Sequence, residues 1–284
     1  MRRTMWRTLT SAVIGACAAA FLTPSAFAQA SAQATAQAAA PEVTLTRFDC
    51  GTSAPPADVG RFSDIYSYRG LMLQIVFSCY LIKHGDEYMV WDTGHSLSAG
   101  ALAPKVSLVD QLAQLQLKPE QIKFVGISHY HPDHTGQVGS FPQATLLIGK
   151  GDWDVLTSPK PAANPAPFAN WISGGGKVEP VPLDKDVFGD GTVVMLATPG
   201  HTPGHHSMLV RLRQMGYVLI SGDMAHFREN FDSDGVPPFN TSRAETLASL
   251  DRVKKIIANT KASLVIQHDA RDVGKLPVFP GAAN

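Results

Sequence analysis

The sequence predicts a mixed α/β fold in which two sheets pack against each other and helices cover their outer faces. Short apolar runs of strand length come first along the chain, and later runs are mixed with helical patterns. Hydrophobic residues make up 44% of the 284 residues, which is ample for a large core. Only 17% are charged, with 24 basic and 24 acidic side chains and no long run of one sign. This composition argues against a nucleic-acid-binding surface.

The predicted strands are short apolar runs, many rich in β-branched and aromatic residues, with turn-forming residues between several of them. They are Val43–Phe48, Leu73–Lys83, Glu87–Asp92, Ile122–Ser128, Ala144–Ile148, Val193–Thr198, Ser207–Leu212, Tyr217–Ser221 and Leu264–Gln267. The second and third of these runs are joined by His84-Gly85-Asp86, which predicts a hairpin.

Two segments carry the apolar spacing of amphipathic helices. In the first, the apolar positions are Leu108, Leu112 and Leu115. The second opens with a capping box formed by Ser242 and Glu245. Its predicted buried face consists of Leu247, Leu250, Val253 and Ile257. Residues 157–176 hold four prolines and three glycines, so we expect an irregular surface excursion there.

The first 28 residues have the organisation of a secretory signal peptide. They comprise a positive start at Arg2, Arg3 and Arg7, an apolar stretch from Leu9 to Leu22, and the cleavage pattern Ser25-Ala26-Phe27-Ala28. The stretch is shorter than the roughly 20 residues that a membrane-spanning helix needs. A lipoprotein signal at Cys17 is the alternative. We therefore expect a periplasmic or secreted protein without stable membrane insertion.

The segment after the cleavage site, residues 29–40, is low in complexity and predicts a disordered leader before a folded domain at 41–284. Three cysteines are too few for a disulfide scaffold. In an oxidising compartment Cys50 and Cys79 could form a disulfide, or each could be a separate buried thiol. The sequence favours neither arrangement.

The chemistry is concentrated in SHYHPDHTG, which places four potential ligands within six residues, directly after the strand ending at Ser128. On a turn that follows a strand, His129 and His131 can face one ion. Asp133 and His134 can face a second ion nearby. Imidazole and carboxylate groups suit zinc and similar divalent ions. The alternative, a solvated polar turn, is disfavoured by the density of ligands.

This segment resembles the HxHxDH signature of the metallo-β-lactamase superfamily. Further elements similar to the family pattern follow in order: Val90-Trp91-Asp92-Thr93-Gly94, the TPGHTPGH segment at 198–205, Ser221-Gly222-Asp223 and Gln267-His268-Asp269. The resemblance spans roughly Val43 to His268. It implies a four-layer αββα sandwich of two mixed sheets flanked by helices, and a hydrolase domain.

Carried over residue by residue, the resemblance implies a site for two divalent metal ions, with zinc as the expected metal. His129, His131 and His201 would hold the first ion, Asp133, His134 and His268 the second, and Asp223 would bridge them. Such a pair lowers the pKa of a shared water and makes hydroxide available. Asp92 and His205 would support the ligands, His206 would begin the next strand, and His84 and His95 are expected at the surface.

Within the superfamily, the sequence is most similar to the N-acyl-homoserine lactonases of the quorum-quenching branch. Those enzymes commonly carry a tyrosine three residues after the bridging aspartate, where this chain has His226. The resemblance implies that a metal-bridging hydroxide opens the lactone ring and that Asp133 protonates the leaving alkoxide. His226 would donate a hydrogen bond to the oxyanion, unless it only packs or faces solvent.

Other functions stay open at this point. Asp223 argues against a true β-lactamase, and residues 225–238 lack the basic cluster of glutathione thiolester hydrolases. A secreted phosphotriesterase of the same superfamily is the main rival, whereas the complete ligand set argues against a non-enzymatic metal-binding protein. A homodimer is compatible with the sequence. A substrate with an apolar acyl chain requires an apolar groove in the protein. The candidates for this groove are the loop Phe62–Met72, with Tyr66, Tyr68 and Leu71, the 157–176 excursion, with Phe168 and Trp171, and the pair Phe227 and Phe231.

Overall fold

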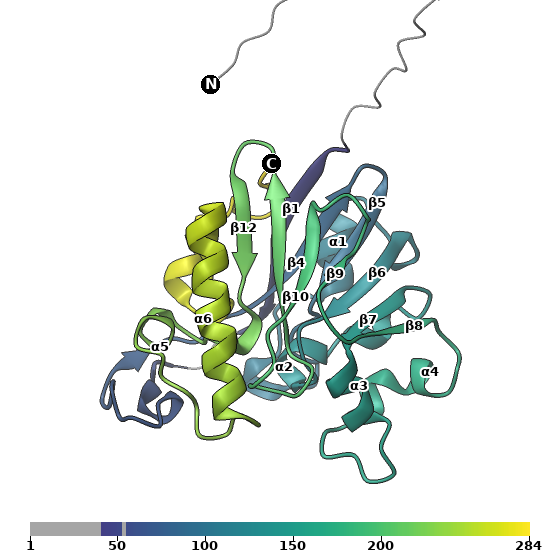
Figure 1. Ribbon diagram of the computed structural model, residues 1–284. Coiled ribbons are helices and arrows are strands. Elements are labelled where there is room, and N and C mark those ends of the chain that lie inside the picture. Colours follow the sequence, from purple (N-terminus) through teal and green to yellow (C-terminus); the bar gives the residue numbers. More distant parts are fainter. Residues whose placement is uncertain (1–40, 53–54) are drawn as a thin grey trace, which may run out of the picture. The chain divides into compact units, whose positions relative to one another are not determined.

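The computed structural model describes residues 41–52 and 55–284, which form two packed sheets with helices outside them (Figure 1). This confirms the predicted mixed α/β sandwich. The predicted signal peptide, its cleavage site and the leader at 29–40 lie outside the described residues.

The first sheet has six strands in the order β1-β4-β5-β6-β7-β8. Their bounds are β1 Val43–Gly51, β4 Phe77–His84, β5 Glu87–Trp91, β6 Ile122–Ile127, β7 Thr145–Gly149 and β8 Val178–Val181. Strands β1, β4 and β5 pair antiparallel, whereas β5 to β8 pair parallel. The hairpin between β4 and β5 turns at residues 85–86, as predicted.

The second sheet has five strands in the order β13-β12-β11-β10-β9. They are β9 Lys185–Asp186, β10 Val193–Ala197, β11 His206–Leu212, β12 Gly216–Ile220 and β13 Ser263–Val265. Only β12 and β13 pair parallel. A separate two-stranded ribbon consists of β2 (Ala57–Asp58) and β3 (Met72–Leu73).

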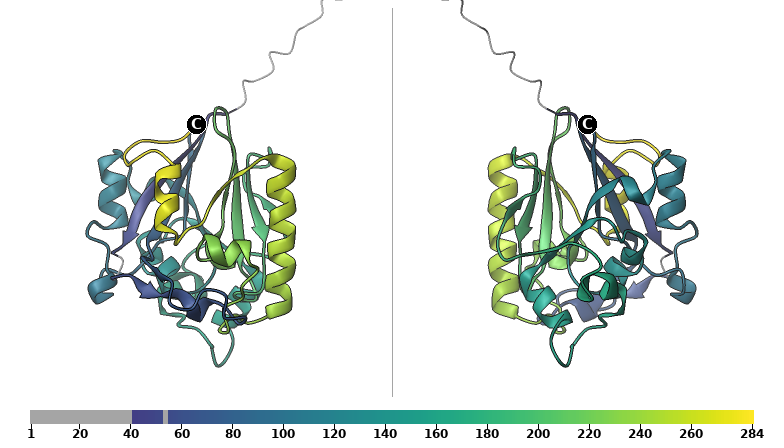
Figure 2. Two further views of the ribbon diagram at one scale, coloured as in Figure 1. Left: turned by 90° about the vertical axis from the view of Figure 1, so that its left-hand side faces the viewer. Right: turned by 90° about the vertical axis from the view of Figure 1, so that its right-hand side faces the viewer.

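Helices cover the outer faces of both sheets, so that α1 and α6 lie on opposite sides of the sandwich (Figure 2). The helices are α1 Leu108–Gln114, α2 Pro132–Thr135, α3 Lys150–Leu156, α4 Ala169–Ile172, α5 Arg228–Asp232 and α6 Arg243–Thr260. Short 3₁₀ helices are η1 Val59–Phe62, η2 Gly100–Leu102, η3 Pro119–Gln121, η4 Val138–Ser140, η5 Ala166–Phe168, η6 Gly222–Met224 and η7 Ala270–Lys275.

The core is layered in the same way as the backbone. One apolar cluster, which includes Tyr80 and Met208, fills the space between the two sheets. A second cluster packs Leu108 and Leu112 of α1 against the outer face of the first sheet, and a third packs Leu250 of α6 against the second. Each sheet has apolar side chains on both of its faces, so one face must pack against the other sheet and the other must be covered by helices. This gives the αββα order of layers.

The N-terminus of α6 forms one half of the predicted capping box, because the Ser242 hydroxyl accepts a hydrogen bond from the Glu245 amide at 3.2 Å. The other half is absent, since the Ser242 amide donates to the Gly200 carbonyl at 2.9 Å instead of to the Glu245 side chain. On this helix Leu250 and Val253 are buried, whereas Leu247 and Ile257 are partly buried. Within residues 41–52 and 55–284, no helix combines the length and apolarity needed to cross a membrane.

Two sequence-based expectations about elements are wrong. The strand predicted at Leu73–Lys83 is interrupted at residues 74–76, because Ile75 bridges to Asp269 and the Val76 amide donates to the His268 carbonyl at 3.1 Å. Residues 157–176 are not wholly irregular, since they contain η5 and α4. Their aromatic side chains insert into the core and anchor both short helices.

The two cysteines left open by the sequence are joined as the disulfide Cys50–Cys79, which links β1 to β4. Both are fully buried in the cluster beneath α1. The Cys50 carbonyl also accepts a hydrogen bond from the His95 amide at 2.9 Å. The disulfide therefore stands directly behind the loop that follows β5.

Candidate metal centre and active site

The candidate metal ligands converge because the loops that carry them all leave the same edge of the sandwich. Strands β5 and β6 run parallel, as do β12 and β13. Strand β10 shares the direction of β12, because both are antiparallel to β11. The loops after the carboxyl ends of these strands therefore open onto one crevice, the usual place for a site in open α/β sheets.

The first group of potential ligands is His129, His131, His201 and Asp223, with one ligand atom from each lying within 4.8 Å of the others. His131 Nδ1 lies 2.9 Å from Nε2 of His129 and 3.0 Å from Nε2 of His201. His129 and His201 are buried, and Asp223 Oδ2 lies 3.6 and 3.4 Å from their Nε2 atoms. The three histidines and one carboxylate oxygen therefore face one point.

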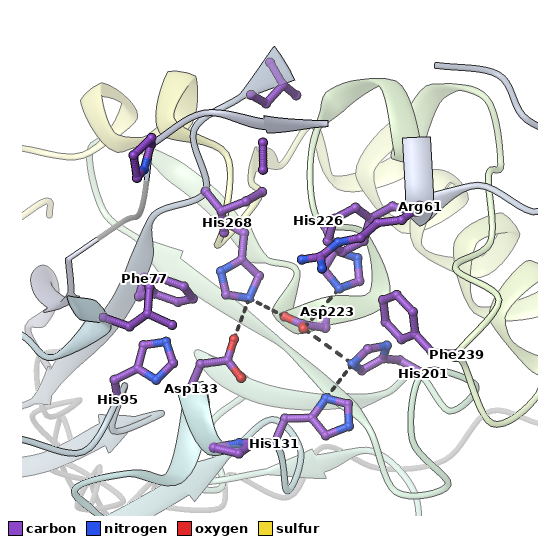
Figure 3. A pocket seen from close by; sticks show the side chains of 17 residues that line it. Arg61, Phe77, His95, His131, Asp133, His201, Asp223, His226, Phe239 and His268 are labelled. Carbon is purple, nitrogen blue, oxygen red and sulfur yellow. Dashed lines mark hydrogen bonds and ion pairs between the residues drawn. The ribbon is translucent and has the colours of Figure 1, made fainter. Parts of the chain in front are cut away.

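The second group is Asp133, His134, Asp223 and His268, again with ligand atoms within 4.8 Å of one another. Asp223 Oδ1 lies 3.1 Å from Nε2 of His134 and 2.9 Å from Nε2 of His268. Asp133 Oδ2 lies 3.7 and 3.6 Å from the same two nitrogens. The two oxygens of Asp223 thus point to different groups, and this carboxylate joins them (Figure 3).

The outer contacts of the histidines determine which ring nitrogen points inward. Nδ1 of His134 lies 2.8 Å from Asp92 Oδ2, Nδ1 of His201 lies 2.8 Å from Asn240 Oδ1, and Nδ1 of His268 lies 2.8 Å from the Val76 carbonyl. These oxygens only accept, so each Nδ1 carries the hydrogen. The Nε2 lone pairs are left to face the centre, which is the usual arrangement of metal-binding histidines.

The interior of the cluster requires positive charge. Nε2 of His134 and Nε2 of His268 face each other at 3.2 Å, an arrangement in which at most one can donate to the other. Buried Asp223 Oδ1 accepts no well-oriented hydrogen bond from any described residue. Converging lone pairs and an unsatisfied carboxylate oxygen are stabilised by cations, so this donor set fits divalent metal ions.

The pKa values of the cluster agree with this requirement. Burial lowers the pKa of His129 and His201 well below the usual histidine value, so both rings are neutral and able to bind a metal. Burial also lowers the pKa of His134, but the charges of Asp223, Asp92 and Asp133 raise it by more. Its net pKa is raised, because the carboxylates around it attract positive charge, whether from protons or metal.

Asp92 supports the second group from behind. Its carboxylate accepts hydrogen bonds from the Ser128 amide at 2.7 Å, from the Ser128 hydroxyl at 2.8 Å and from Gln267 Nε2 at 2.7 Å. Asp92 is fully buried at the end of β5. Its carboxylate holds His134 and the residues that precede His129 and His268 in one network, as expected for a supporting group.

His205 and His206 lie behind the first group. His205 Nε2 accepts a hydrogen bond from the Asp223 amide at 2.9 Å, and its Nδ1 lies 3.0 Å from the Thr198 carbonyl. Burial lowers the pKa of His205 to about 3, so the ring stays neutral and can accept that bond. His206 is the first residue of β11, as predicted.

The remaining histidines differ from expectation in one case. His84 is partly exposed and lies 2.8 Å from Asp190, in agreement with a surface position. His95 instead lines a cavity that opens over the two groups of ligands, and its ring contacts Phe77 at 4.3 Å between centroids. The surface prediction for His95 is wrong because the loop after β5 turns inward, held by the Cys50 carbonyl.

His226 lies within the site. Its Nε2 is 3.2 Å from Asp223 Oδ2, and its ring lies 5.3 Å from the ring of His201 and 5.9 Å from that of His268. Its Nδ1 is buried and has no hydrogen-bond partner among the described residues. The ring packs against Phe62 at 4.5 Å. The interpretation of His226 as a solvent-facing residue is therefore wrong.

A cavity of about 460 Å³ opens over both groups. Its apolar lining includes Phe62, Leu73, Ile75, Phe77, Leu102 and Phe239. Figure 3 shows Phe77 and His95 on one side of Asp133 and Asp223, with Phe239 and Arg61 on the other. The polar cluster therefore forms part of an otherwise largely apolar pocket, which suits an apolar ligand with one polar reacting group.

The candidate groove residues from the sequence are mostly elsewhere. Phe168 and Trp171 are buried beneath the first sheet, and Trp171 Nε1 donates to the Ala144 carbonyl at 3.2 Å. Phe231 packs with the residues of α6. Those assignments to the groove are wrong. An aromatic side chain in a loop packs against whichever apolar surface lies nearest, and for these three residues that surface is the core.

Two aromatic candidates lie behind the cavity wall. Phe227 is buried and contacts Phe62 at 5.5 Å and Tyr68 at 5.1 Å. The Tyr68 hydroxyl donates to the Phe62 carbonyl. Tyr66 is exposed beneath the Arg69 guanidinium, and Leu71 packs with the cluster around Tyr68. Of the whole 62–72 segment, only Phe62 lines the cavity.

Sequence reasoning missed several residues of the site. Asn240, Arg61 and Phe239 lie in segments without strand periodicity or a ligand motif, so no local signal marked them. The amide of Asn240 is oriented by Thr246, whose hydroxyl accepts from Asn240 Nδ2 at 3.0 Å. The contact between Asn240 and His201 depends on the segment before α6 lying beside the loop after β10, which the sequence alone does not reveal.

The αββα sandwich with two carboxylate-linked histidine clusters defines a metallo-hydrolase. Comparison with known families gives the same class: residues 78–260 match the model of the metallo-β-lactamase superfamily. The chain belongs to that superfamily.

Curated relatives carry a more specific name. The chain is 32% identical over 232 residues to N-acyl homoserine lactonase AttM of Rhizobium radiobacter, covering 70% of this chain and 84% of the relative. It is 28% identical over 230 residues to an N-acyl homoserine lactonase of Bacillus cereus, covering 74% and 88%. Among solved structures, an N-acyl homoserine lactone hydrolase with N-hexanoyl-L-homoserine bound at its catalytic metal centre shares the fold, with a TM-score of 0.71 and 23% identity. That match covers 86% of this chain and 99% of the other.

Proposed function

We propose that this enzyme hydrolyses the lactone ring of N-acyl-homoserine lactones. The observation that carries the proposal is a carboxylate-linked histidine cluster within a largely apolar cavity of about 460 Å³. A lactone with an acyl chain presents the matching chemistry, namely one polar carbonyl group and a long apolar tail. The curated relatives bearing the lactonase name support the same substrate class.

The residues that would hold metal are those of the two groups. His129, His131 and His201 would bind one divalent ion, Asp133, His134 and His268 a second, and Asp223 both. Zinc is the proposed metal, because histidine and carboxylate ligands suit it. Such ions supply a water nucleophile at neutral pH and polarise a carbonyl group.

The protein side chains would divide the remaining work. Asp133, which is partly exposed and lines the cavity, would accept the proton that the attacking water gives up and deliver it to the alkoxide that leaves when the ring opens. His226 lines the same cavity and would donate a hydrogen bond to the oxygen on which charge develops. Phe62, Phe77 and Phe239 would cover the acyl chain and exclude water from the reacting bond.

The test is a panel of substrates given to the zinc-loaded enzyme. Homoserine lactones of several chain lengths, a nitrophenyl phosphotriester, a β-lactam and a glutathione thiolester are compared by kcat/KM. We expect the homoserine lactones to be hydrolysed fastest, with an acyl-homoserine as the product. Rapid phosphotriester hydrolysis without any opening of a lactone would assign the enzyme to phosphotriesters instead.

We further propose that the protein is exported after cleavage behind Ala28, giving a periplasmic or secreted enzyme. The Cys50–Cys79 disulfide supports this proposal, because disulfides persist in oxidising compartments. Mass spectrometry of protein recovered outside the cytoplasm should find a new terminus at Gln29. An intact Met1 or a lipidated Cys17 would contradict it.

A further inference from the structure

We propose that Asp152, which belongs to neither group of ligands, is a positioning residue. It joins the loop that carries His129 and His131 to the loop that carries His201, and thereby sets the affinity of the first group for metal. The inference rests on the metal sites proposed above. Asp152 lies at the start of α3 and is completely buried. Its role follows from what its two oxygens contact.

The Asp152 carboxylate bonds to both loops at once. Oδ2 accepts a hydrogen bond from the Tyr130 amide at 3.2 Å and another from the Thr202 hydroxyl at 2.8 Å. Oδ1 accepts from the Gly204 amide at 2.7 Å. Tyr130 lies between His129 and His131, whereas Thr202 directly follows His201. One side chain therefore holds both of the loops that carry the three histidines of the first group.

Three glycines allow this carboxylate to come so close. A Cβ atom on Gly149 would lie 1.7 Å from the Gly204 carbonyl oxygen, and one on Gly151 would lie 2.7 Å from Pro203. A Cβ atom on Gly204 would lie 2.3 Å from the Asp152 amide nitrogen. The turn from β7 into α3 and the loop after β10 are thus in direct backbone contact. The GKGD sequence at 149–152 is built for this contact rather than for a flexible turn.

The chemistry of the three bonds makes an aspartate necessary. All three partners are positioned as donors, so they require an acceptor on both oxygens. An asparagine has nearly the same shape, but in either orientation its NH₂ group would face a backbone N–H, that of Tyr130 or that of Gly204, and lose that hydrogen bond. Hydrogen bonds to a carboxylate are also stronger than those between neutral groups. Asp152 makes no hydrogen bond or ion pair to Asp133, His134 or His268, so the second group should keep its affinity.

The experiment compares zinc binding to wild type, Asp152→Asn and Asp154→Asn, by titration against a competing chelator. Asp154 is a matched control, because it lies on the same helix but is exposed and pairs with Lys150. In Asp152→Asn we expect one of the two binding constants to weaken about 10- to 100-fold, the usual effect of losing a supporting contact, while the other changes little. Asp154→Asn should match wild type.

A second variant guards against a general loss of folding. Thr202→Val keeps the side-chain shape and removes one of the three bonds, so it should weaken the same constant by a smaller factor. Two constants unchanged in both Asp152→Asn and Thr202→Val would overturn the role of Asp152. Equal weakening of both constants would overturn its restriction to the first group. A wild-type protein that binds fewer than two ions would contradict the two-ion site itself.

Discussion

Phe239 offers a direct test of whether the cavity binds an acyl chain. Its side chain lines the cavity, packs against Phe62 at 5.7 Å and is 52% exposed. An aromatic side chain has roughly 200 Å² of surface, so about 100 Å² is free, and a bound chain that covers half of it buries about 50 Å². At about 25 cal/mol per Å², this contact stabilises the bound chain by about 1.2 kcal/mol.

The corresponding assay measures kcat/KM of wild type and Phe239→Ala on homoserine lactones with four to twelve acyl carbons. For the longest chains, about 1.2 kcal/mol corresponds to a loss of about eightfold, provided that the contact is expressed in the transition state. The four-carbon substrate is too short to cover the ring and should lose little. Leu183→Ala is the control, because Leu183 is 72% exposed and lies outside the cavity.

The comparison of chain lengths decides the outcome. An equal loss for all lengths would mean that Phe239 affects the reacting centre rather than the acyl chain. No loss for the longest chains would refute the assignment of this wall to the acyl group, while leaving lactone hydrolysis itself untouched.

Three further predictions follow from the same geometry. Asp223→Ala should release at least one of about two bound divalent ions and abolish most of the activity, because its oxygens face both groups; unchanged metal content by elemental analysis would contradict the bridging role. His226→Phe should keep the metal content but lower kcat about 100-fold if the imidazole donates to the oxyanion, and an unchanged kcat would assign it to packing. His205 has a pKa of about 3 in the folded chain, below the value of about 6.5 expected when unfolded, so its contribution to stability is complete above that value and is lost as the pH falls. Between pH 7 and 5 the difference in free energy of unfolding between wild type and His205→Asn should shrink by about 2 kcal/mol in urea titrations of the metal-free protein, whereas a constant difference would show that His205 does not carry this linkage.

Much of the fold was predictable because it depends on local pattern. The strands at Glu87–Asp92 and Ile122–Ser128 and the helix opened by Ser242 all appear in the structure within a residue or two of the predicted bounds. Each signal acts within one turn or one strand, so it survives without knowledge of the partners. The uninterrupted strand predicted at Leu73–Lys83 failed because a distant segment, at His268 and Asp269, pairs with residues 75–76.

The sequence could not predict which surface each aromatic side chain packs against. Trp171 and Phe239 both lie in segments rich in proline or glycine, and neither shows periodicity. Trp171 packs into the core and Phe239 lines the cavity. Burial against either surface removes apolar area from water in the same way, so the outcome depends on which surface the chain brings near.

The sequence by itself determined which side chains could bind metal, because His129 to His134 lie within six residues and their spacing after a strand makes them face one place. Only the tertiary structure decided how that chemistry is completed. The family resemblance already named Asp223 and His268 as ligands, and the structure shows that both reach the site from the other sheet, that Asn240 orients His201, and that Asp152 joins the loops. The physical reason is the separation along the chain. A ligand motif consists of residues that are close in sequence, so it can be recognised there. The orientation of a lone pair or a carboxylate depends on hydrogen bonds between distant segments, which meet only when both sheets have packed.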